Sequence, residues 1–238
     1  MKALQIPKII HQIWSGIDEP LPKHFKILGE TWKESHPSWE YIVWDNKKMN
    51  AFVQEYYPQY WDIYNAFKYN IQRWDAIRYL ILYQMGGMYV DFDYECLEPL
   101  DGLLSSATCC FSAEPPEHKT IFKDNNYFNN ALMACTPKHW FMQKIIGHAF
   151  DRVNIEKKYP NKMHEVLETT GPIMLTRLYA GCENKEDIYI IPAEFVSPIT
   201  KGDVESYLLN QGDKALEDYL EKRLEKALAI HYFLGNWL

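Results

Sequence analysis

The N-terminal part of the chain alternates between short apolar runs and longer segments with apolar residues at helical spacing. Short apolar runs bounded by turn residues are typical of buried strands, and a period near 3.6 is typical of helices. We therefore expect strands alternating with helices. The predicted elements are strands at Lys8–Trp14 and Trp39–Trp44, a helix at Leu21–Ser35, a helix capped by Asp45 or Asn46 that runs to Tyr56, and a short helical stretch before Tyr69.

The segment from Ile71 to Asp93 has the clearest pattern. Ile71–Met85 reads as a helix that is apolar on nearly every side, and Gly86-Gly87 supplies its C-terminal stop. Met88–Val90 is a short apolar strand, and Asp91-Phe92-Asp93 follows directly. The segment therefore predicts a buried helix, a tight turn, a buried strand and two carboxylates at the strand end.

The rest of the chain continues the alternation, with a helical region towards the C-terminus. Strands followed by helices indicate an α/β fold. We expect a single mostly parallel central sheet flanked by helices, in one domain over residues 1–238, as the length suits. The further elements are strands at Thr108–Ser112, Asn130–Cys135, Asp187–Ile191 and Ala229–Phe233, and helices at Lys138–Phe150, from Thr170-Gly171-Pro172 to Gly181, and at Asp213–Ala227.

Composition limits the class of protein. The net charge is −7, and no Lys/Arg block occurs, which disfavours a nucleic-acid partner. The five cysteines are odd in number and form no C-x-x-C pair, so neither a disulfide framework nor a structural zinc site is indicated. Reduced thiols are expected, as in a cytosol.

From the sequence we expect neither a targeting segment nor a membrane-spanning segment. Lys8, His11 and Gln12 interrupt the apolar residues near the N-terminus, so no signal-peptide core is present. No apolar run reaches the ~18 residues that a membrane span needs. We expect a cytoplasmic protein. The charged pattern of Asp213–Ala227 is that of a solvated helix face, and peripheral contact with the inner face of the cell membrane is the alternative.

Two charged residues interrupt the apolar helix. Arg78 follows Asp75 at i+3, so the two share a face. A helix that is apolar all round is buried, and buried charges need each other or a polar ligand. A structural ion pair and a binding site both satisfy that need. The position just before Asp91 and Asp93 favours the site.

The carboxylate pair predicts a metal site. Ligands of open α/β sheets bind beyond the carboxyl ends of the strands, where Asp91 and Asp93 stand. Mg²⁺ and Mn²⁺ prefer oxygen ligands and are often held by one or two carboxylates together with substrate phosphates. A bound cation would also give an acidic protein the local positive charge that an anionic substrate requires.

These residues resemble the sugar-binding region of glycosyltransferase family 32, which includes yeast initiating mannosyltransferases, bacterial capsule and lipopolysaccharide enzymes and, by the same pattern, clostridial glucosylating toxins. The most specific part is the run from Asp75-x-x-Arg78 through Gly86-Gly87-x-Tyr89 to Asp91-x-Asp93. Supporting similarities extend over nearly the whole chain, at 6–14, Trp32, 39–45, 129–134, 170–172, His231 and 236–237.

The resemblance implies a GT-A fold, a nucleotide-sugar donor and a divalent metal, usually Mn²⁺, with Mg²⁺ as the alternative. Asp93 would bind the metal directly, and Asp91 would contact the ribose or reach the metal through water. Asp75 and Arg78 would hold hydroxyl groups of the donor sugar. Asn130 is either a turn residue or a further polar group that reaches the sugar.

The same likeness assigns three residues outside this segment. Trp14 would stack on the base, Trp237 would close over the diphosphate, and His231 would complete the metal shell, although the toxins use a carboxylate there. Trp14 is otherwise a core residue. We see no confident nucleophile, because Asp75 suits a positioning role better, and a front-face mechanism needs none.

The expected function is retaining, metal-dependent transfer of a hexose from a nucleotide diphosphate sugar to a glycan or lipid-linked glycan. A UDP-sugar is favoured and GDP-mannose is the alternative donor. The compact chain suggests bacterial surface polysaccharide synthesis, such as that of capsule or lipopolysaccharide. Two alternatives are an inactive relative that binds nucleotide sugars and a metal-dependent phosphohydrolase, which would carry its carboxylate pair after the first strand.

Overall fold

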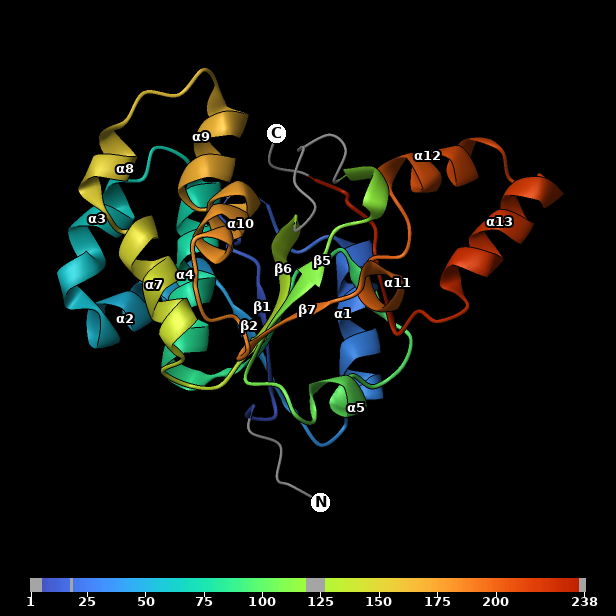
Figure 1. The fold of residues 1–238 in the computed structure, drawn as a ribbon, viewed down its shortest axis with the longest axis horizontal. Helices are drawn as coiled ribbons and strands as arrows, with labels where there is room; N and C mark the ends of the chain where they lie inside the picture. The colour runs from blue at the N-terminus through green and yellow to red at the C-terminus, as the bar shows by residue number, and fades with distance from the viewer. Residues whose placement is uncertain (1–5, 18, 119–126, 236–238) are drawn as a thin grey trace.

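A computed structural model describes residues 6–17, 19–118 and 127–235, except the side chain of residue 155. A central sheet separates two layers of helices (Figure 1). On one side lie α2, α3, α4, α7, α8, α9 and α10, and on the other lie α1, α5 and α11. The expected α/β class with a mostly parallel sheet flanked by helices is confirmed.

The described part of the sheet has six strands in the order β2-β1-β3-β6-β5-β7. Only β6 runs against the others, since it pairs antiparallel with both β3 and β5. A second, two-stranded sheet joins β4 to β8. The strands are β1 (Ile9–Ile13), β2 (Glu40–Trp44), β3 (Gly87–Val90), β4 (Tyr94–Cys96), β5 (Cys109–Ala113), β6 (Phe128–Cys135), β7 (Ile188–Ile191) and β8 (Ala229–His231).

The helices follow the sheet strands in the order that the apolar pattern predicts. They are α1 (Lys23–Ser35), α2 (Asn46–Tyr56), the 3₁₀ turn η1 (Pro58–Tyr60), α3 (Trp61–Ala66), α4 (Asn70–Met85), α5 (Asp101–Leu104), α7 (Trp140–Ala149), α8 (Arg152–Glu156), α9 (Lys162–Thr169), α10 (Pro172–Ala180), α11 (Ala193–Val196), α12 (Lys201–Leu209) and α13 (Lys214–Leu224).

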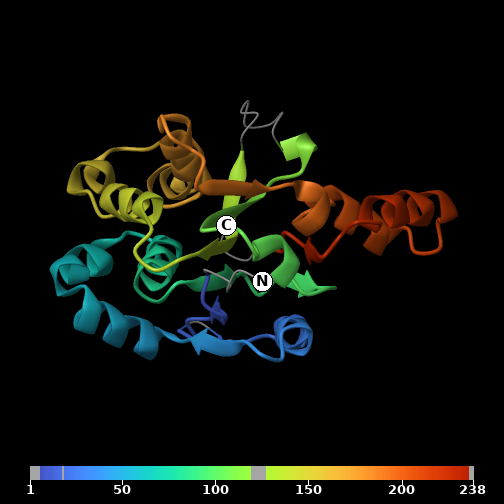
Figure 2. The ribbon, with the colours of Figure 1, turned by 60° about the horizontal axis from the view of Figure 1, so that its bottom comes forward.

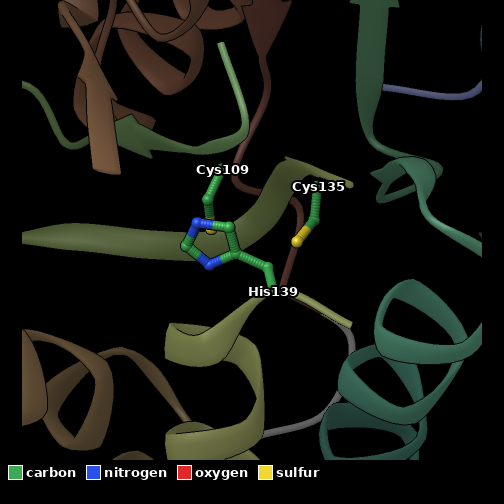
Figure 3. Close-up of side chains that lie close together, drawn as sticks. All are labelled: Cys109, Cys135 and His139. Carbon is green, nitrogen blue, oxygen red and sulfur yellow. The ribbon is translucent and has the colours of Figure 1, made fainter. Parts of the chain in front are cut away.

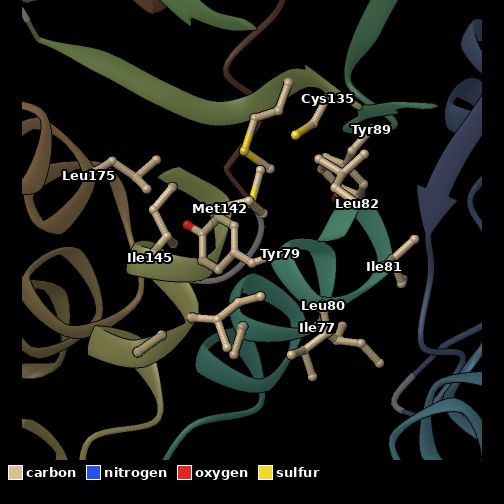
Figure 4. Packing of buried hydrophobic residues seen from close by; sticks show 14 of the residues in the cluster. Ile77, Tyr79, Leu80, Ile81, Leu82, Tyr89, Cys135, Met142, Ile145 and Leu175 are labelled. Carbon is tan, nitrogen blue, oxygen red and sulfur yellow. The ribbon is translucent and has the colours of Figure 1, made fainter. Parts of the chain in front are cut away.

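Strand alternation builds a separate core on each face of the sheet. On β3, Tyr89 faces the layer that contains α4 and α7, whereas Met88 and Val90 face the layer that contains α1. In the first of these cores, α4 packs Ile77, Leu80 and Leu82 among residues of α7 and α10 (Figure 4). The helix is buried on nearly every side, as its sequence predicts, and this burial fixes its charged face relative to the sheet.

Several predicted boundaries are wrong. The strand expected at Asn130–Cys135 begins at Phe128, because Asn129 and Asn130, which resemble turn residues, donate instead to buried carboxylates on other elements, Glu114 and Asp75. The helix expected to reach Ala227 ends at Leu224. The strand β4 and the helices α5, α8, α9, α11 and α12 were not predicted.

The helices α12 and α13 form a hairpin that projects sideways from the body in both views (Figures 1 and 2). Neither helix contains a buried residue, which agrees with the solvated helix face expected for α13. None of the helices in the described part of the chain combines the length and the apolar character needed to cross a membrane.

Gly87 connects α4 to the sheet, so its substitution tests this packing. Its φ is +96°, and a Cβ there would lie 2.5 Å from the carbonyl oxygen of Ile9. We expect Gly87→Ala to lower the free energy of unfolding by at least about 2 kcal/mol, from strain and displacement of β1. Gly102→Ala is the control, because nothing lies within 4 Å of its added Cβ. Equal stabilities of the two variants in urea denaturation would contradict this account.

Candidate active site at the carboxyl edge of the sheet

A pocket of about 470 Å³ opens where the parallel strands end. This volume falls in the range of small-ligand sites. Residues from several elements line it because the carboxyl ends of β1, β3 and β5 meet the start of the antiparallel β6. Most of the sequence-predicted site residues are among them, namely Trp14, Asp75, Arg78, Asp91, Asp93, Asn130 and His231.

Arg78 occupies the floor of this pocket and joins two carboxylates. Its Nη2 lies 3.2 Å from Asp75 Oδ1, and its Nη1 lies 3.3 Å from Asp91 Oδ1. Nη1 also donates to the carbonyl oxygen of Asn130 at 2.8 Å, and the guanidinium stacks 4.4 Å from the ring centre of Tyr89. The ion pair and the binding-site interpretations of Asp75 and Arg78 are therefore compatible, since the pair itself lines the pocket.

Both carboxylate oxygens of Asp75 have hydrogen-bond donors. Asn130 Nδ2 donates to Oδ1 at 2.9 Å, and Thr170 Oγ1 donates to Oδ2 at 3.0 Å. Tyr79 supports this arrangement, because its hydroxyl accepts from Asn130 and donates to the carbonyl oxygen of Thr170. Asp75 is thus held in a single orientation.

Burial shifts the pKa of both carboxyls beside Arg78. Burial raises the pKa of Asp75 to about 6, against the opposing effects of Arg78 and Thr170. It also raises the pKa of Asp91, with the nearby Asp93 acting in the same direction and Arg78 opposing it. The hydroxyl of Tyr89 donates to Asp91 Oδ1. Asp91 therefore turns one oxygen towards Arg78 and Tyr89.

Asp93 has a different environment. Its Oδ1 lies 3.4 Å from His231 Nε2, and its Oδ2 accepts from the main-chain N–H of Leu234 at 3.0 Å. Burial alone would raise the pKa of Asp93, but His231 and these donors outweigh it and lower the pKa. Burial would lower the pKa of His231, but the same carboxylate outweighs it and raises the pKa. The antiparallel pairing of Tyr94 with His231 sets this geometry.

The donor set fits a divalent metal. Asp93 and His231 present an oxygen and a nitrogen at a spacing that two ligands of one ion can adopt, with Asp91 beside them. His231 Nδ1 is buried, and the described residues give it no hydrogen-bond partner. Carboxylates suit Mg²⁺ and Mn²⁺, and imidazole accepts transition metals. Asp91, Asp93 and His231 are thus the residues that would hold the ion.

Of the two aromatic residues predicted for the site, the structure describes Trp14 but not Trp237. Trp14 is half-buried in the pocket wall, where its Nε1 donates to the carbonyl oxygen of Glu19 at 3.0 Å and its ring packs edge-on against Phe25 and Phe92. Its stacking on a base stays a prediction. Trp237, expected to close over a diphosphate, lies outside the described residues.

Sequence reasoning missed Glu114 and Lys201, two polar groups that line the pocket. Glu114 is buried after β5, where it accepts from Asn129 Nδ2 at 2.8 Å and contacts His118 at 2.6 Å. Lys201 begins α12 and reaches the pocket from the hairpin. A strand end after β5 was the signal that could have indicated Glu114. No local pattern indicated Lys201.

Comparison with known families agrees with this geometry. Residues 22–109 match the family described as "Glycosyltransferase sugar-binding region containing DXD motif", a match that includes Asp75, Arg78, Asp91 and Asp93. The chain belongs to this family. The family description names a glycosyltransferase, which is the enzyme class that the sequence predicts.

Two curated yeast proteins show the relationship over most of the chain. Inositol phosphoceramide mannosyltransferase 1 of Schizosaccharomyces pombe is 34% identical over 196 residues, which are 79% of this chain and 56% of the relative. A mannosyl phosphorylinositol ceramide synthase of Saccharomyces cerevisiae is 31% identical over 178 residues, 75% of this chain and 43% of the relative. The chain thus spans about half the length of these relatives.

Among solved structures, the PaToxG glycosyltransferase has a similar fold. Its TM-score is 0.55 at 18% sequence identity, and the alignment covers 92% of this chain and 79% of that one. The expected GT-A fold is confirmed.

Removal of Arg78 tests the electrostatics of the pocket floor. We expect Arg78→Ala to lower the free energy of unfolding near neutral pH by about 3–5 kcal/mol, because the buried Asp75 and the half-buried Asp91 lose their partner. The matched control is Arg177→Ala, which breaks the largely exposed pair with Glu168 and should cost about 1 kcal/mol or less.

The loss in free energy of unfolding caused by Arg78→Ala should depend on pH. The pKa of Asp75 in the folded protein is about 6, above the ordinary 3.8, so folding favours its protonated form and its ionisation destabilises the fold. Without Arg78 this pKa rises further. The loss measured by urea denaturation should therefore shrink on going from neutral to about pH 5. A loss that is constant over this range would contradict the assignment.

Proposed function

We propose that the chain catalyses metal-dependent transfer of a hexose from a nucleotide diphosphate sugar, with retention of anomeric configuration. The proposal rests on two clusters of polar residues in one pocket. Asp75, Arg78 and Asn130 form the first cluster, and Asp93 and His231 form the second. The first cluster suits sugar hydroxyl groups. The second suits a cation that carries a diphosphate.

Charge supports the need for a cation. Among the described residues that line the pocket, Arg78 and Lys201 are the permanent cations, and Arg78 is already shared by two carboxylates. The lining residues Glu19, Asp75, Asp91, Asp93 and Glu114 carry five formal negative charges, against the two positive charges of Arg78 and Lys201. A divalent ion offsets most of this excess. When bound, Mn²⁺ or Mg²⁺ would stabilise the negative charge that develops on the departing diphosphate.

The protein residues would bind and orient the reactants. Asp75 and Arg78 would hold donor-sugar hydroxyl groups, Asp91 the ribose, and Trp14 the base. Asp75 is a poor nucleophile in this geometry, because Arg78 and Asn130 occupy one oxygen and Thr170 occupies the other. We therefore favour a front-face reaction, in which the acceptor hydroxyl attacks as the diphosphate leaves and takes no covalent help from the enzyme.

The relatives' names narrow the sugar and the acceptor. Both curated yeast relatives are named for mannosyl transfer to inositol phosphoceramide. We therefore propose mannose as the first sugar to test, which moves GDP-mannose ahead of the UDP-sugars that the sequence favours. A lipid with an inositol phosphate headgroup is the first acceptor, and the bacterial surface-polysaccharide acceptor is the alternative. Lys201 at the pocket rim would suit an acceptor phosphate.

The rival interpretations have less support. In a phosphohydrolase of the expected kind the carboxylate pair follows the first strand, whereas here it follows β3. An inactive relative would tolerate loss of one of the four residues Asp75, Arg78, Asp91 and Asp93, and all four line one pocket.

A panel of nucleotide sugars, each with and without Mn²⁺, tests the proposed function. Thermal shift should identify one donor that stabilises the protein only with metal, and that donor should undergo slow metal-dependent hydrolysis. Transfer to inositol phospholipid and to polysaccharide intermediates then separates the two acceptor classes. Release of phosphate from aryl phosphates, or donor binding with no hydrolysis and no transfer, would contradict the proposal.

Asp93→Asn tests the metal assignment. The variant should lose the Mn²⁺-dependent thermal shift and at least about a hundredfold of the hydrolysis rate, since a direct ligand is removed. Its fold should change little, because the asparagine oxygen still accepts from Leu234. Glu98→Gln, an exposed carboxylate outside the pocket, is the matched control. Unchanged metal dependence in Asp93→Asn would refute the role.

A further inference from the structure

A second group of ligand-type side chains lies away from the donor pocket. Cys109, Cys135 and His139 are buried, and one ligand atom from each lies within 4.8 Å of the others. Figure 3 shows the imidazole beside the two sulfur atoms. The cysteines come from β5 and β6, and the histidine precedes α7. Cys135 lies five positions after Asn130 on β6, about 16 Å along a strand.

Backbone pairing directs the two sulfur atoms to one point. Cys109 is directly opposite Cys135 in the antiparallel pair of β5 and β6. The N–H of Thr136 donates to the carbonyl oxygen of Thr108, which makes the cysteines a non-hydrogen-bonded pair. Side chains approach most closely in such pairs. Both cysteines point into the core that contains α4 and α7.

His139 is oriented by its role at the start of α7. Its Nδ1 accepts from the N–H of Phe141 at 3.2 Å and caps the helix. Its Nε2 is buried without a hydrogen-bond partner among the described residues. An unpaired buried polar atom costs about 1–3 kcal/mol, so this nitrogen is positioned for a ligand.

We propose that Cys109 Sγ, Cys135 Sγ and His139 Nε2 bind a structural zinc ion. Zinc–sulfur and zinc–nitrogen bonds are about 2.3 Å and 2.0 Å long, so ligand atoms of one ion lie within about 4.6 Å, close to the observed spacing. Binding forms three metal–ligand bonds and releases two thiol protons to solvent. Two thiolates, one neutral imidazole and Zn²⁺ have no net charge, as an apolar interior requires.

Two further features favour zinc over a disulfide. The amino end of the ten-residue helix α7 lies next to the sulfur atoms, and its dipole favours a thiolate, which opposes the burial that raises the pKa of the Cys109 thiol. A disulfide between Cys109 and Cys135 would leave His139 Nε2 without a partner, whereas zinc uses all three groups. The ion would tie the sheet to α7, which packs against α4, the helix that carries Asp75 and Arg78. Its role is thus structural.

Metal content of the reduced protein, purified without a histidine tag, tests the site. After incubation with equimolar Zn²⁺ and desalting, the wild type should retain about one zinc per chain. Cobalt substitution should give a thiolate-to-metal charge-transfer band. Zinc should raise the melting temperature of the metal-free protein, and Mn²⁺ should not reproduce this rise.

Variants distinguish a specific loss of zinc binding from a general effect on folding. His139→Asn keeps a side chain that caps α7 but removes the ligand nitrogen, and should lose the zinc. Cys182→Ala removes a buried thiol of the same core outside the cluster, and Asp93→Asn removes a donor-site residue; both should retain zinc. The proposal is overturned if the wild type retains no zinc, if His139→Asn retains it equally, or if mass spectrometry finds a Cys109–Cys135 disulfide.

Discussion

The buried guanidinium of Arg78 is the interaction on which the pocket depends. It pairs with Asp75 from its own helix and with Asp91 beyond β3, and it donates to the main chain of Asn130 on β6. One side chain therefore fixes the relative positions of α4, β3 and β6. Removing two carboxylates from water is costly unless a partner compensates them. The backbone elements can converge at this edge only because that partner is present.

In the proposed function, the same interaction would allow an acidic chain to bind an anionic donor. Arg78 offsets part of the negative charge of the aspartates but leaves the Asp93 side of the pocket negative, with His231 as its neighbour. A cation is attracted to this side, and a diphosphate to the cation. The neutralised side keeps fixed hydrogen-bonding groups for neutral hydroxyls. In the proposed function, one part of the pocket would hold the sugar and the other a metal-bound diphosphate.

The sequence predicts those features that depend on local pattern. The apolar helix α4, its glycine stop and the strand β3 were readable because burial and turn geometry act within a few residues. Glu114 was missed, and Asn130 and His231 were expected only from the family resemblance, because all three depend on pairing between distant segments. The reversal of β6 brings Asn130 to the carboxyl edge, and the three-residue strand β8 places His231 against Tyr94. For the same reason cysteine spacing did not indicate the cluster at Cys109, since its members come from different elements.

The strand β6 connects the pocket with the opposite end of the sheet. Its first residues hold Asn130 against Asp75, and its last residue, Cys135, faces Cys109 and the start of α7. The helix α7 packs against α4, the helix that carries Asp75. Both α4 and β6 are therefore anchored at the end of the sheet far from the pocket. A hydroxyl-positioning carboxylate works only if its orientation is set before the donor binds. Both oxygens of Asp75 have polar partners, and these partners belong to elements that are fixed at their far ends. Asp75 therefore satisfies that condition, which favours a positioning role over nucleophilic attack.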